Sequence, residues 1–157
     1  MSDETSKPDA KDMLQSIFAM QTDLNNYVFA KNSIGDGSGA HLTVQTIIEQ
    51  VSHGKLSVND LPNQWLVRYS RAMSDELAEL NQDLLWKWWS KDAINLQNVR
   101  VELIDILHFL ISAMLSAGLS AEKVFDIYRQ KHAVNFSRQD TGYSRETKTE
   151  DDNRGIS

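Results

Sequence analysis

Apolar residues recur along most of this chain with the 3.6-residue period of an α-helix. The first such set runs from Met13 to Val28 and predicts a helix over residues 13–30. The same period predicts further helices over residues 41–51, 63–89, 98–117 and 120–137. No alternating run of β-branched residues predicts a strand, so we expect an all-α fold, a bundle of about five helices.

Glycines and capping residues separate the predicted helices. Glycines alternate with polar residues over positions 35–39 and predict a loop. Gly118 suits the left-handed conformation that ends many helices. Ser120 is a good cap for the last helix, and Glu122 then falls in its first turn, where the helix dipole favours negative charge.

The two ends of the chain differ in composition from its middle. Residues 1–11 are polar and predict a flexible N-terminal tail. Residues 12–138 carry the apolar periodicity and predict one all-α domain. Residues 139–157 have too few apolar side chains to join a core, but Tyr143 and Lys148 are suited to phosphate. We therefore expect this C-terminal tail to be a lid that a ligand orders.

Composition and charge narrow the class of protein. The 157 residues are 41% apolar and 24% charged, and no run approaches the roughly 18 apolar residues of a membrane span. The N-terminus lacks the features of a secretory signal and there is no cysteine, so we expect a cytoplasmic location. A net charge of −6 argues against duplex nucleic acid as the main partner.

Two acidic pairs stand inside apolar helical patterns. Glu76 and Glu79 form the first, and Glu102 and Asp105 form the second. Residues three apart share one face of a helix, so two antiparallel helices would bring four carboxylates together. Their repulsion would be severe without a cation among them. Hard divalent cations such as Mg²⁺ bind carboxylate oxygens and commonly serve phosphate chemistry.

Such spacing is also common on solvated helix faces, but the surroundings of the second pair favour a site. Glu102, Asp105 and His108 follow one another at steps of three within a nearly all-apolar helix, so part of this stripe faces a packed interior. Buried carboxylates need partners, and Arg100 alone cannot neutralise four of them. His108 is either a core histidine or a polar contact to the ligand.

Other polar and aromatic residues leave two interpretations open. Tryptophans at positions 86, 88 and 89 are typical of a core or an interface, although Trp88 could lie flat against a base and Lys87 could reach a phosphate. Gln21 and Asn25, one turn apart, could bind only water, or their amides could read the polar edge of a base.

The acidic pattern is similar to that of the all-α nucleoside triphosphate pyrophosphohydrolases, which include MazG-like proteins and the dimeric dUTPases. Segments 21–25, 86–89 and 131–143 resemble the dimeric dUTPase branch in particular. The short chain, without an inserted helical segment before the last helix, and the stretches 102–105 and 135–143 also resemble the bacteriophage deoxycytidine triphosphatases.

The resemblance implies a role for each matching residue. The metal ligands match Glu76, Glu79, Glu102 and Asp105. We expect Glu79 to be the base, because it lies between the metal site and the solvent end of its helix, with Glu76 as the second catalytic carboxylate. Contacts to the base or sugar match Gln21, Asn25, Trp88, Phe109 and Asn135. Phosphate contacts match Lys131, Arg138, Tyr143 and Lys148.

The resemblance implies Mg²⁺-dependent hydrolysis of dUTP to dUMP and pyrophosphate. Two or more Mg²⁺ ions are expected, for which Mn²⁺ can substitute, and the partner is a small nucleotide, with a homodimer or a dimer of dimers as the assembly. The alternatives are a dCTP pyrophosphatase and a non-catalytic nucleotide-binding MazG-like module. A purely structural dimerisation domain would leave the clustered carboxylates unexplained.

Overall fold

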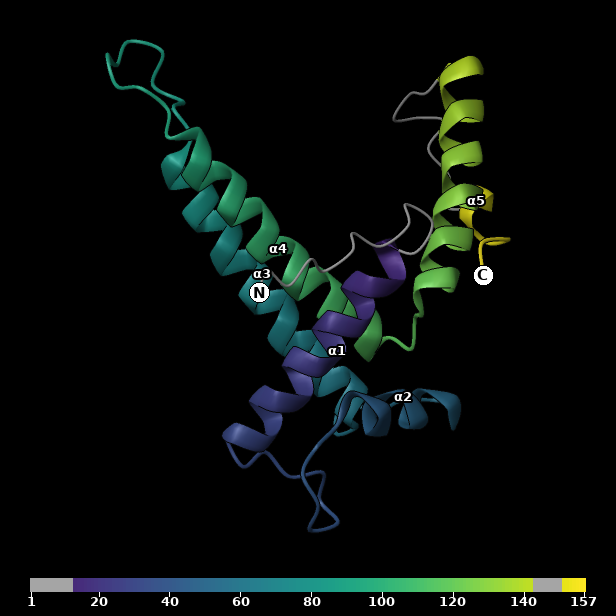
Figure 1. Ribbon diagram of the computed structural model, residues 1–157. Helices are drawn as coiled ribbons and strands as arrows, with labels where there is room; N and C mark the ends of the chain where they lie inside the picture. Colours follow the sequence, from purple (N-terminus) through teal and green to yellow (C-terminus); the bar gives the residue numbers. More distant parts are fainter. Residues whose placement is uncertain (1–12, 143–150) are drawn as a thin grey trace, which may run out of the picture. The chain divides into compact units, whose positions relative to one another are not determined.

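The computed structural model describes residues 13–142 and 151–157 and is all-helical over these ranges (Figure 1). The helices are α1 (Met13–Lys31), α2 (Val44–Ser52), α3 (Leu61–Asp83), α4 (Leu96–Ser116), α5 (Ala121–Asp140) and the short 3₁₀ helix η1 (Asp151–Asn153). In the described parts no strand forms, and Gly35 and His41 make an isolated antiparallel bridge. The prediction of an all-α fold with five helices is confirmed. The predicted N-terminal tail, residues 1–11, lies outside the described residues.

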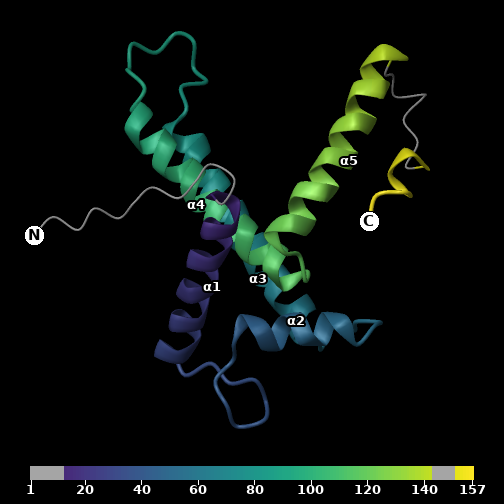
Figure 2. The ribbon, with the colours of Figure 1, turned by 45° about the vertical axis from the view of Figure 1, so that its right-hand side comes forward.

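The chain divides into two compact units, Met1–Leu119 and Ser120–Ser157. In the first unit α3 and α4 run side by side, α1 packs against α4, and α2 contacts α3 and α4 (Figure 2). Its core takes side chains from α1, α2, α3, α4 and the loop between α1 and α2, with Phe29, Leu42 and Ile47 almost fully buried. This packing fixes α1, α3 and α4 around one volume, in which the candidate site lies.

Side-chain caps set where the helices begin. Thr43 accepts a hydrogen bond from the Thr46 amide (3.1 Å), so α2 begins at Val44 and not at residue 41. Asn95 caps α4 in the same way, which starts this helix two residues earlier than expected, at Leu96. The predicted cap at Ser120 is confirmed by its hydrogen bond from the Lys123 amide (3.2 Å).

The prediction that α3 continues to residue 89 is wrong. The helix ends at Asp83, and Leu84 turns the backbone into an extended conformation. Trp86, Trp88 and Trp89 instead lie in the loop to α4, where they are 61–88% exposed and pack edge-to-face on one another. Bulky aromatic residues favour helices only weakly, so contacts among the indoles can replace another helical turn.

The predicted left-handed glycine after α4 is confirmed. Gly118 has φ +76°, its amide donates to the Leu115 carbonyl, and the Leu119 amide donates to the Met114 carbonyl. These two bonds satisfy carbonyls at the helix end. A Cβ on Gly118 would also lie 2.9 Å from Cγ1 of Val51, so close packing against α2 adds a second reason for glycine.

In the second unit α5 contacts η1. The Lys131 ammonium donates to Oδ1 of Asn153 (2.5 Å), and the Gln130 amide donates to the carbonyl of Ser157 (3.4 Å). The helix extends to Asp140, three residues beyond its predicted end. Across the described ranges, no single helix has the length and apolar content to cross a membrane, and α4 and α5 meet that test only when taken together across their break.

Candidate active site

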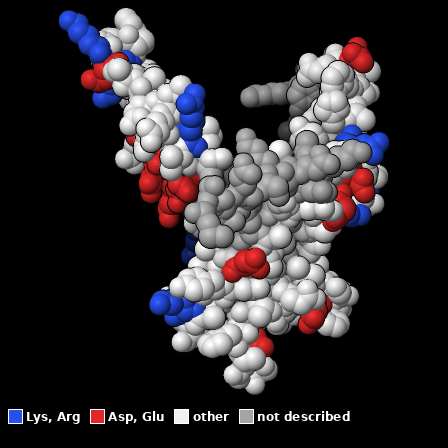
Figure 3. Space-filling view, viewed as in Figure 1, with Lys and Arg blue, Asp and Glu red and all other residues white. Residues whose placement is uncertain are grey.

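Three carboxylates meet where α3 and α4 run side by side. Glu76 comes from α3, and Glu102 and Asp105 come from α4, with one oxygen of each lying within 4.8 Å of the others. Acidic side chains gather over these two helices in Figure 3. Glu102 is only 9% exposed. The predicted convergence of the two acidic pairs is therefore present for three of its four members.

Electrostatics in this cluster favour added positive charge. Burial raises the pKa of Glu102, and the charges of Glu79, Glu76 and Asp105 raise it further. Burial likewise raises the pKa of Glu76, with Glu79 and Asp105 as the next causes, while a hydrogen bond from Glu102 opposes the shift. A carboxyl with a raised pKa is one whose negative charge lacks compensation.

These three carboxylates fit a hard divalent cation, because they supply oxygen ligands only and stand close enough to share one ion. Glu79 is not part of the three-residue group, and its side chain is exposed. Its charge nevertheless acts on both Glu76 and Glu102, so it lies at the edge of the cluster. From there it is open to water, as a base would need to be.

A cavity of about 390 Å³ adjoins the carboxylates, since Glu76 and Asp105 form part of its wall. An aromatic series lines the rest, running from α1 across α3 to α4. The ring centroids are 4.6 Å apart for Phe29 and Trp65, 5.5 Å for Trp65 and Tyr69, and 6.4 Å for Tyr69 and Phe109. Both the volume and the apolar lining are typical of a site for a small planar ligand.

Polar side chains from α1 and α4 complete the cavity wall. Gln21 and Asn25 are buried, and the Gln21 amide donates to Oδ1 of Asn25 (2.9 Å). His108 Nδ1 lies 2.6 Å from Gln21 Oε1, and the Asn25 amide donates to Oγ of Ser112 (3.1 Å). The cavity therefore combines an aromatic surface, an amide edge and a carboxylate cluster.

Several residues that line this cavity were not predicted from the sequence, among them Phe29, Trp65, Tyr69 and Ser112. Trp65 and Tyr69 are one turn apart on α3, and Ser112 is one turn beyond His108 on α4. Burial raises the pKa of Tyr69 to about 12, so its hydroxyl stays protonated well above neutral pH. Helical spacing was the only available signal, and such spacing more often indicates a core.

Lys87 and Trp88 do not line this cavity. Both are exposed in the loop between α3 and α4, and Trp88 is 88% exposed. The Lys87 ammonium lies 5.5 Å from the ring centroid of Trp86. Lys87 therefore lies beside an aromatic ring, and Trp88 is exposed to solvent outside the cavity.

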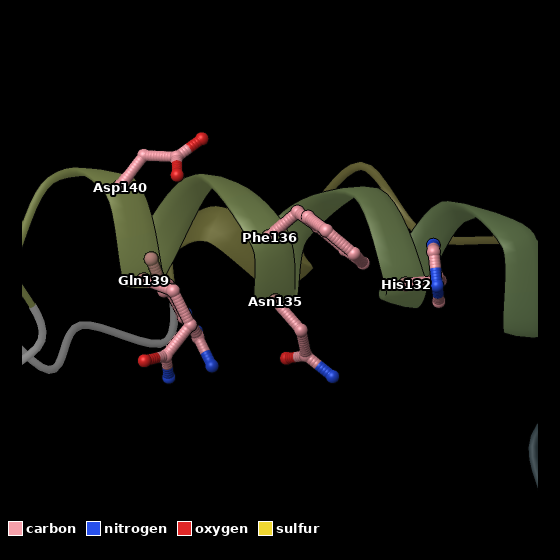
Figure 4. Close-up of a pocket in the computed structure, with 6 residues that line it drawn as sticks. His132, Asn135, Phe136, Gln139 and Asp140 are labelled. Carbon is pink, nitrogen blue, oxygen red and sulfur yellow. The ribbon is translucent and has the colours of Figure 1, made fainter.

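The remaining predicted contacts belong to the second unit. Asn135 and Arg138 line a hollow of about 550 Å³ along α5 with His132 and Phe136. Figure 4 shows the Asn135 and Gln139 amides extending from one side of this helix. Lys131, also on α5, holds Asn153 as described above. Tyr143 and Lys148 lie outside the described residues.

Comparison with known proteins places these features in a family. The dUTPase family matches residues 13–119, which hold the carboxylate cluster and the cavity. A dCTP pyrophosphatase of Enterobacteria phage LZ5 is 32% identical and one of Enterobacteria phage T4 is 29% identical, each over 62% of this chain and 51% of its own length. A DNA replication protein of phage T4 is 25% identical over 60% of this chain and 22% of its own length.

The chain thus spans about half the length of the two pyrophosphatases that it matches. No solved structure matches it. The family match covers four of the five α-helices and every residue of the cluster and cavity. The chain belongs to this family of dUTPase-like, all-helical nucleoside triphosphate pyrophosphohydrolases.

Proposed function

We propose that this protein hydrolyses a pyrimidine deoxynucleoside triphosphate, with dUTP as the preferred substrate, to the monophosphate and pyrophosphate. The observation that carries the proposal is the contact between the carboxylate cluster and the aromatic cavity, because Glu76 and Asp105 belong to both. A nucleotide requires a planar apolar surface for its base and a charged site for its phosphates at one short separation.

Each wall of the cavity has a part in this reaction. The pyrimidine would lie against Trp65, Tyr69 and Phe109, while Gln21 and Asn25 hydrogen-bond its polar edge. Aromatic burial without the amides would bind any flat ring, so the amides supply the selection.

Glu76, Glu102 and Asp105 would hold Mg²⁺, or Mn²⁺ in its place, with Glu79 completing the set. Bound there, the metal supplies Lewis-acid polarisation of the phosphate oxygens. A carboxylate oxygen of Glu79 accepts the proton of the attacking water, because this side chain is exposed beside the cluster. From the resemblance of residues 131–143 to the dimeric dUTPases, Lys131 and Arg138 would neutralise the departing pyrophosphate and Asn135 would contact the base or sugar.

A second substrate has its own support. Both pyrophosphatases named above act on dCTP, according to their names, and they match the segment that contains the cavity. A dCTP pyrophosphatase is therefore the alternative, with the same carboxylate chemistry and a different base edge. A nucleotide-binding module without turnover would retain the same residues and would be recognised by binding without product release.

Pyrophosphate release is the direct test. The purified protein is assayed with Mg²⁺ and dUTP, dCTP, dTTP, UTP and dATP in parallel, beside the variants Glu102→Gln and Glu49→Gln. We expect dUTP to be hydrolysed fastest, Glu102→Gln to be inactive and Glu49→Gln, an exposed change on α2, to be fully active. Tight nucleotide binding without pyrophosphate would support the module instead, and neither binding nor turnover would overturn the proposal.

A further inference from the structure

Glu102 is the most enclosed member of the carboxylate cluster. It is 9% exposed, whereas Glu76 and Asp105 are half-buried. Hydrogen bonds from neighbouring side chains commonly orient the ligands of a metal site, and their loss weakens metal binding. The groups that hold the Glu102 carboxylate in place therefore bear on its use as a ligand.

Asn98 is the side chain that joins Glu102 to the end of the other helix. Its amide nitrogen Nδ2 lies 3.5 Å from Oε1 of Glu102, one turn further along α4. The same nitrogen donates to Oδ2 of Asp83, the last residue of α3. An asparagine Nδ2 carries two hydrogens, which is one for each carboxylate. Asn98 therefore bridges two carboxylates that come from different helices.

The two partners determine the orientation of the Asn98 amide. An ionised carboxylate can only accept a hydrogen bond, and the amide oxygen Oδ1 can also only accept. Exchange of the amide oxygen and nitrogen would therefore set an acceptor against both Asp83 and Glu102. Burial is the main cause that raises the pKa of Glu102, and the charge of Asp83 adds to it, as expected of two carboxylates on either side of one amide. No assumption about a ligand enters this assignment.

The bridge has two opposite effects on the binding of a cation. The amide hydrogens offset part of the negative charge of Glu102, which by itself weakens the attraction for a cation. They also hold Oε1, so that the carboxylate keeps its place beside Glu76 and Asp105 before any ion arrives. A ligand that is already in place costs less to order when binding occurs. The change in cation affinity on removal of the amide shows which effect is larger, because the two have opposite signs.

We infer that Asn98 is a positioning residue of the candidate cation site, that it orients Glu102, and that Asp83 holds Asn98 in place. The inference rests on the proposed function, since it concerns the carboxylates of the same reaction. It adds two residues that act through Glu102 and do not need to touch the ion.

The first test compares Asn98→Ala with Asn63→Ala. Asn63 is a matched control at the other end of α3 from Asp83. Like Asn98 it is half-buried and is the third residue of its helix, and its amide donates to the Val58 carbonyl (3.2 Å). Electron paramagnetic resonance gives the affinity for Mn²⁺ without nucleotide. We expect Asn98→Ala to bind Mn²⁺ about tenfold or more weakly than wild type and Asn63→Ala to bind it equally well.

A second comparison separates the hydrogen bond from the charge of Asp83. Asp83→Asn and Asp83→Ala remove the same negative charge, but only the asparagine retains an oxygen that can accept from Asn98. We expect Asp83→Ala to bind Mn²⁺ about threefold or more weakly than Asp83→Asn, because the amide of Asn98 then has no fixed partner.

Turnover supplies a third measurement. Pyrophosphate release is followed as Mg²⁺ is raised, and we expect Asn98→Ala to need more Mg²⁺ for half its maximal rate than Asn63→Ala does. A purely structural role for Asn98 would lower the maximal rate and leave this Mg²⁺ requirement unchanged. A protein with the expected order of Mn²⁺ affinities but no pyrophosphate release would overturn the proposed function and still support the positioning role.

Three outcomes would overturn the inference itself. They are Mn²⁺ binding by folded Asn98→Ala that is as tight as that of wild type or tighter, equal Mn²⁺ affinities of the two Asp83 variants, and a wild-type protein that binds no Mn²⁺. Circular dichroism checks that each variant is folded. Should Asn98→Ala fail to fold, the two Asp83 variants decide, since Asp83→Asn retains the acceptor for Asn98.

Discussion

Asn98, near the start of α4, donates its side-chain amide to the carboxylate of Asp83, the last residue of α3. This hydrogen bond joins the two ends of the tryptophan-bearing loop. The same amide nitrogen lies 3.5 Å from Oε1 of Glu102, so Asn98 also connects the loop to the carboxylate cluster. The position of the loop and that of a candidate metal ligand are therefore linked through one side chain.

Replacing Asn98 should loosen this junction. We expect Asn98→Ala to lower the free energy of unfolding by about 1–2 kcal/mol, because a hydrogen bond to a charged group is lost. Asn98→Asp should cost more near neutral pH, since it adds a negative charge beside Asp83 and Glu102. Urea denaturation of both variants and wild type checks the order, and equal stability of all three would show that the junction contributes nothing.

The carboxylate cluster should be needed for activity. Each of Glu76→Gln, Glu79→Gln, Glu102→Gln and Asp105→Asn is expected to remove most turnover at saturating Mg²⁺ while the helices remain folded, because each takes away an oxygen ligand or the base. Pyrophosphate release and far-ultraviolet circular dichroism are the measurements. Full activity in any two variants would contradict the site.

The same cluster should lower stability when no divalent cation is bound. The raised pKa of Glu102 means that the folded state holds its proton more tightly than the unfolded chain does. The protonated Glu102 side chain therefore contributes to the stability of the folded state at low pH, and this contribution is lost as the pH rises through the raised pKa. Without added cation, we expect Glu102→Gln to have a higher Tm than wild type near neutral pH and the same Tm below the usual glutamate pKa. A lower Tm at both would contradict this sign.

Local signals explain why most of the fold could be predicted. The apolar period located five helices, and short-range capping at Ser120 and the left-handed glycine at 118 located two of their boundaries. The end of α3 could not be found in this way, because Trp86, Trp88 and Trp89 continue the apolar pattern. The junction there depends on a hydrogen bond between residues 15 positions apart, which no local pattern contains.

The site was predicted to a similar extent and for the same reason. The spacing of three residues identified the two acidic pairs in the sequence. Only the structure shows that α3 packs beside α4, which brings Glu76 next to Glu102 and Asp105. Trp65 and Ser112 acquire their place only when α1 packs against α4, so their pattern in the sequence is that of ordinary core residues.

Gly118 should resist substitution for two separable reasons. We expect Gly118→Ala to lower the free energy of unfolding by about 1 kcal/mol or more through the positive φ, with an added cost from the contact to Val51 Cγ1. Gly37→Ala is the control for φ alone, since φ is +89° there and nothing lies within 4 Å of the added atom. Combining Gly118→Ala with Val51→Ala should recover the steric part, and no recovery would show that backbone strain accounts for the whole effect.

We expect the protein to form a homodimer or a dimer of dimers in solution. Apolar side chains of α1 and α4 remain exposed next to an apolar hollow of about 350 Å³, among them Met20, Leu24 and Ile104. A second copy would remove them from water. Ile104→Glu should then shift the protein toward monomer in light scattering, whereas Val58→Glu, at a more exposed apolar position in the loop before α3, should not. A wild-type monomer at micromolar concentration would contradict the assembly.

Truncation tests the proposed lid. A chain that ends at Asp140 keeps the whole of α5 and lacks Asn153, which accepts a hydrogen bond from Lys131. If the C-terminal residues close over bound phosphates, turnover should fall far more than Tm, since residues 139–157 add little apolar surface to any core.

Asn153→Ala separates the two roles of this segment, because it removes the Lys131 contact and retains the chain. We expect Asn153→Ala to keep most activity and the truncated protein to lose it, as measured by pyrophosphate release. Hydrolysis by the truncated protein at the full-length rate would show that the C-terminal segment is not a lid.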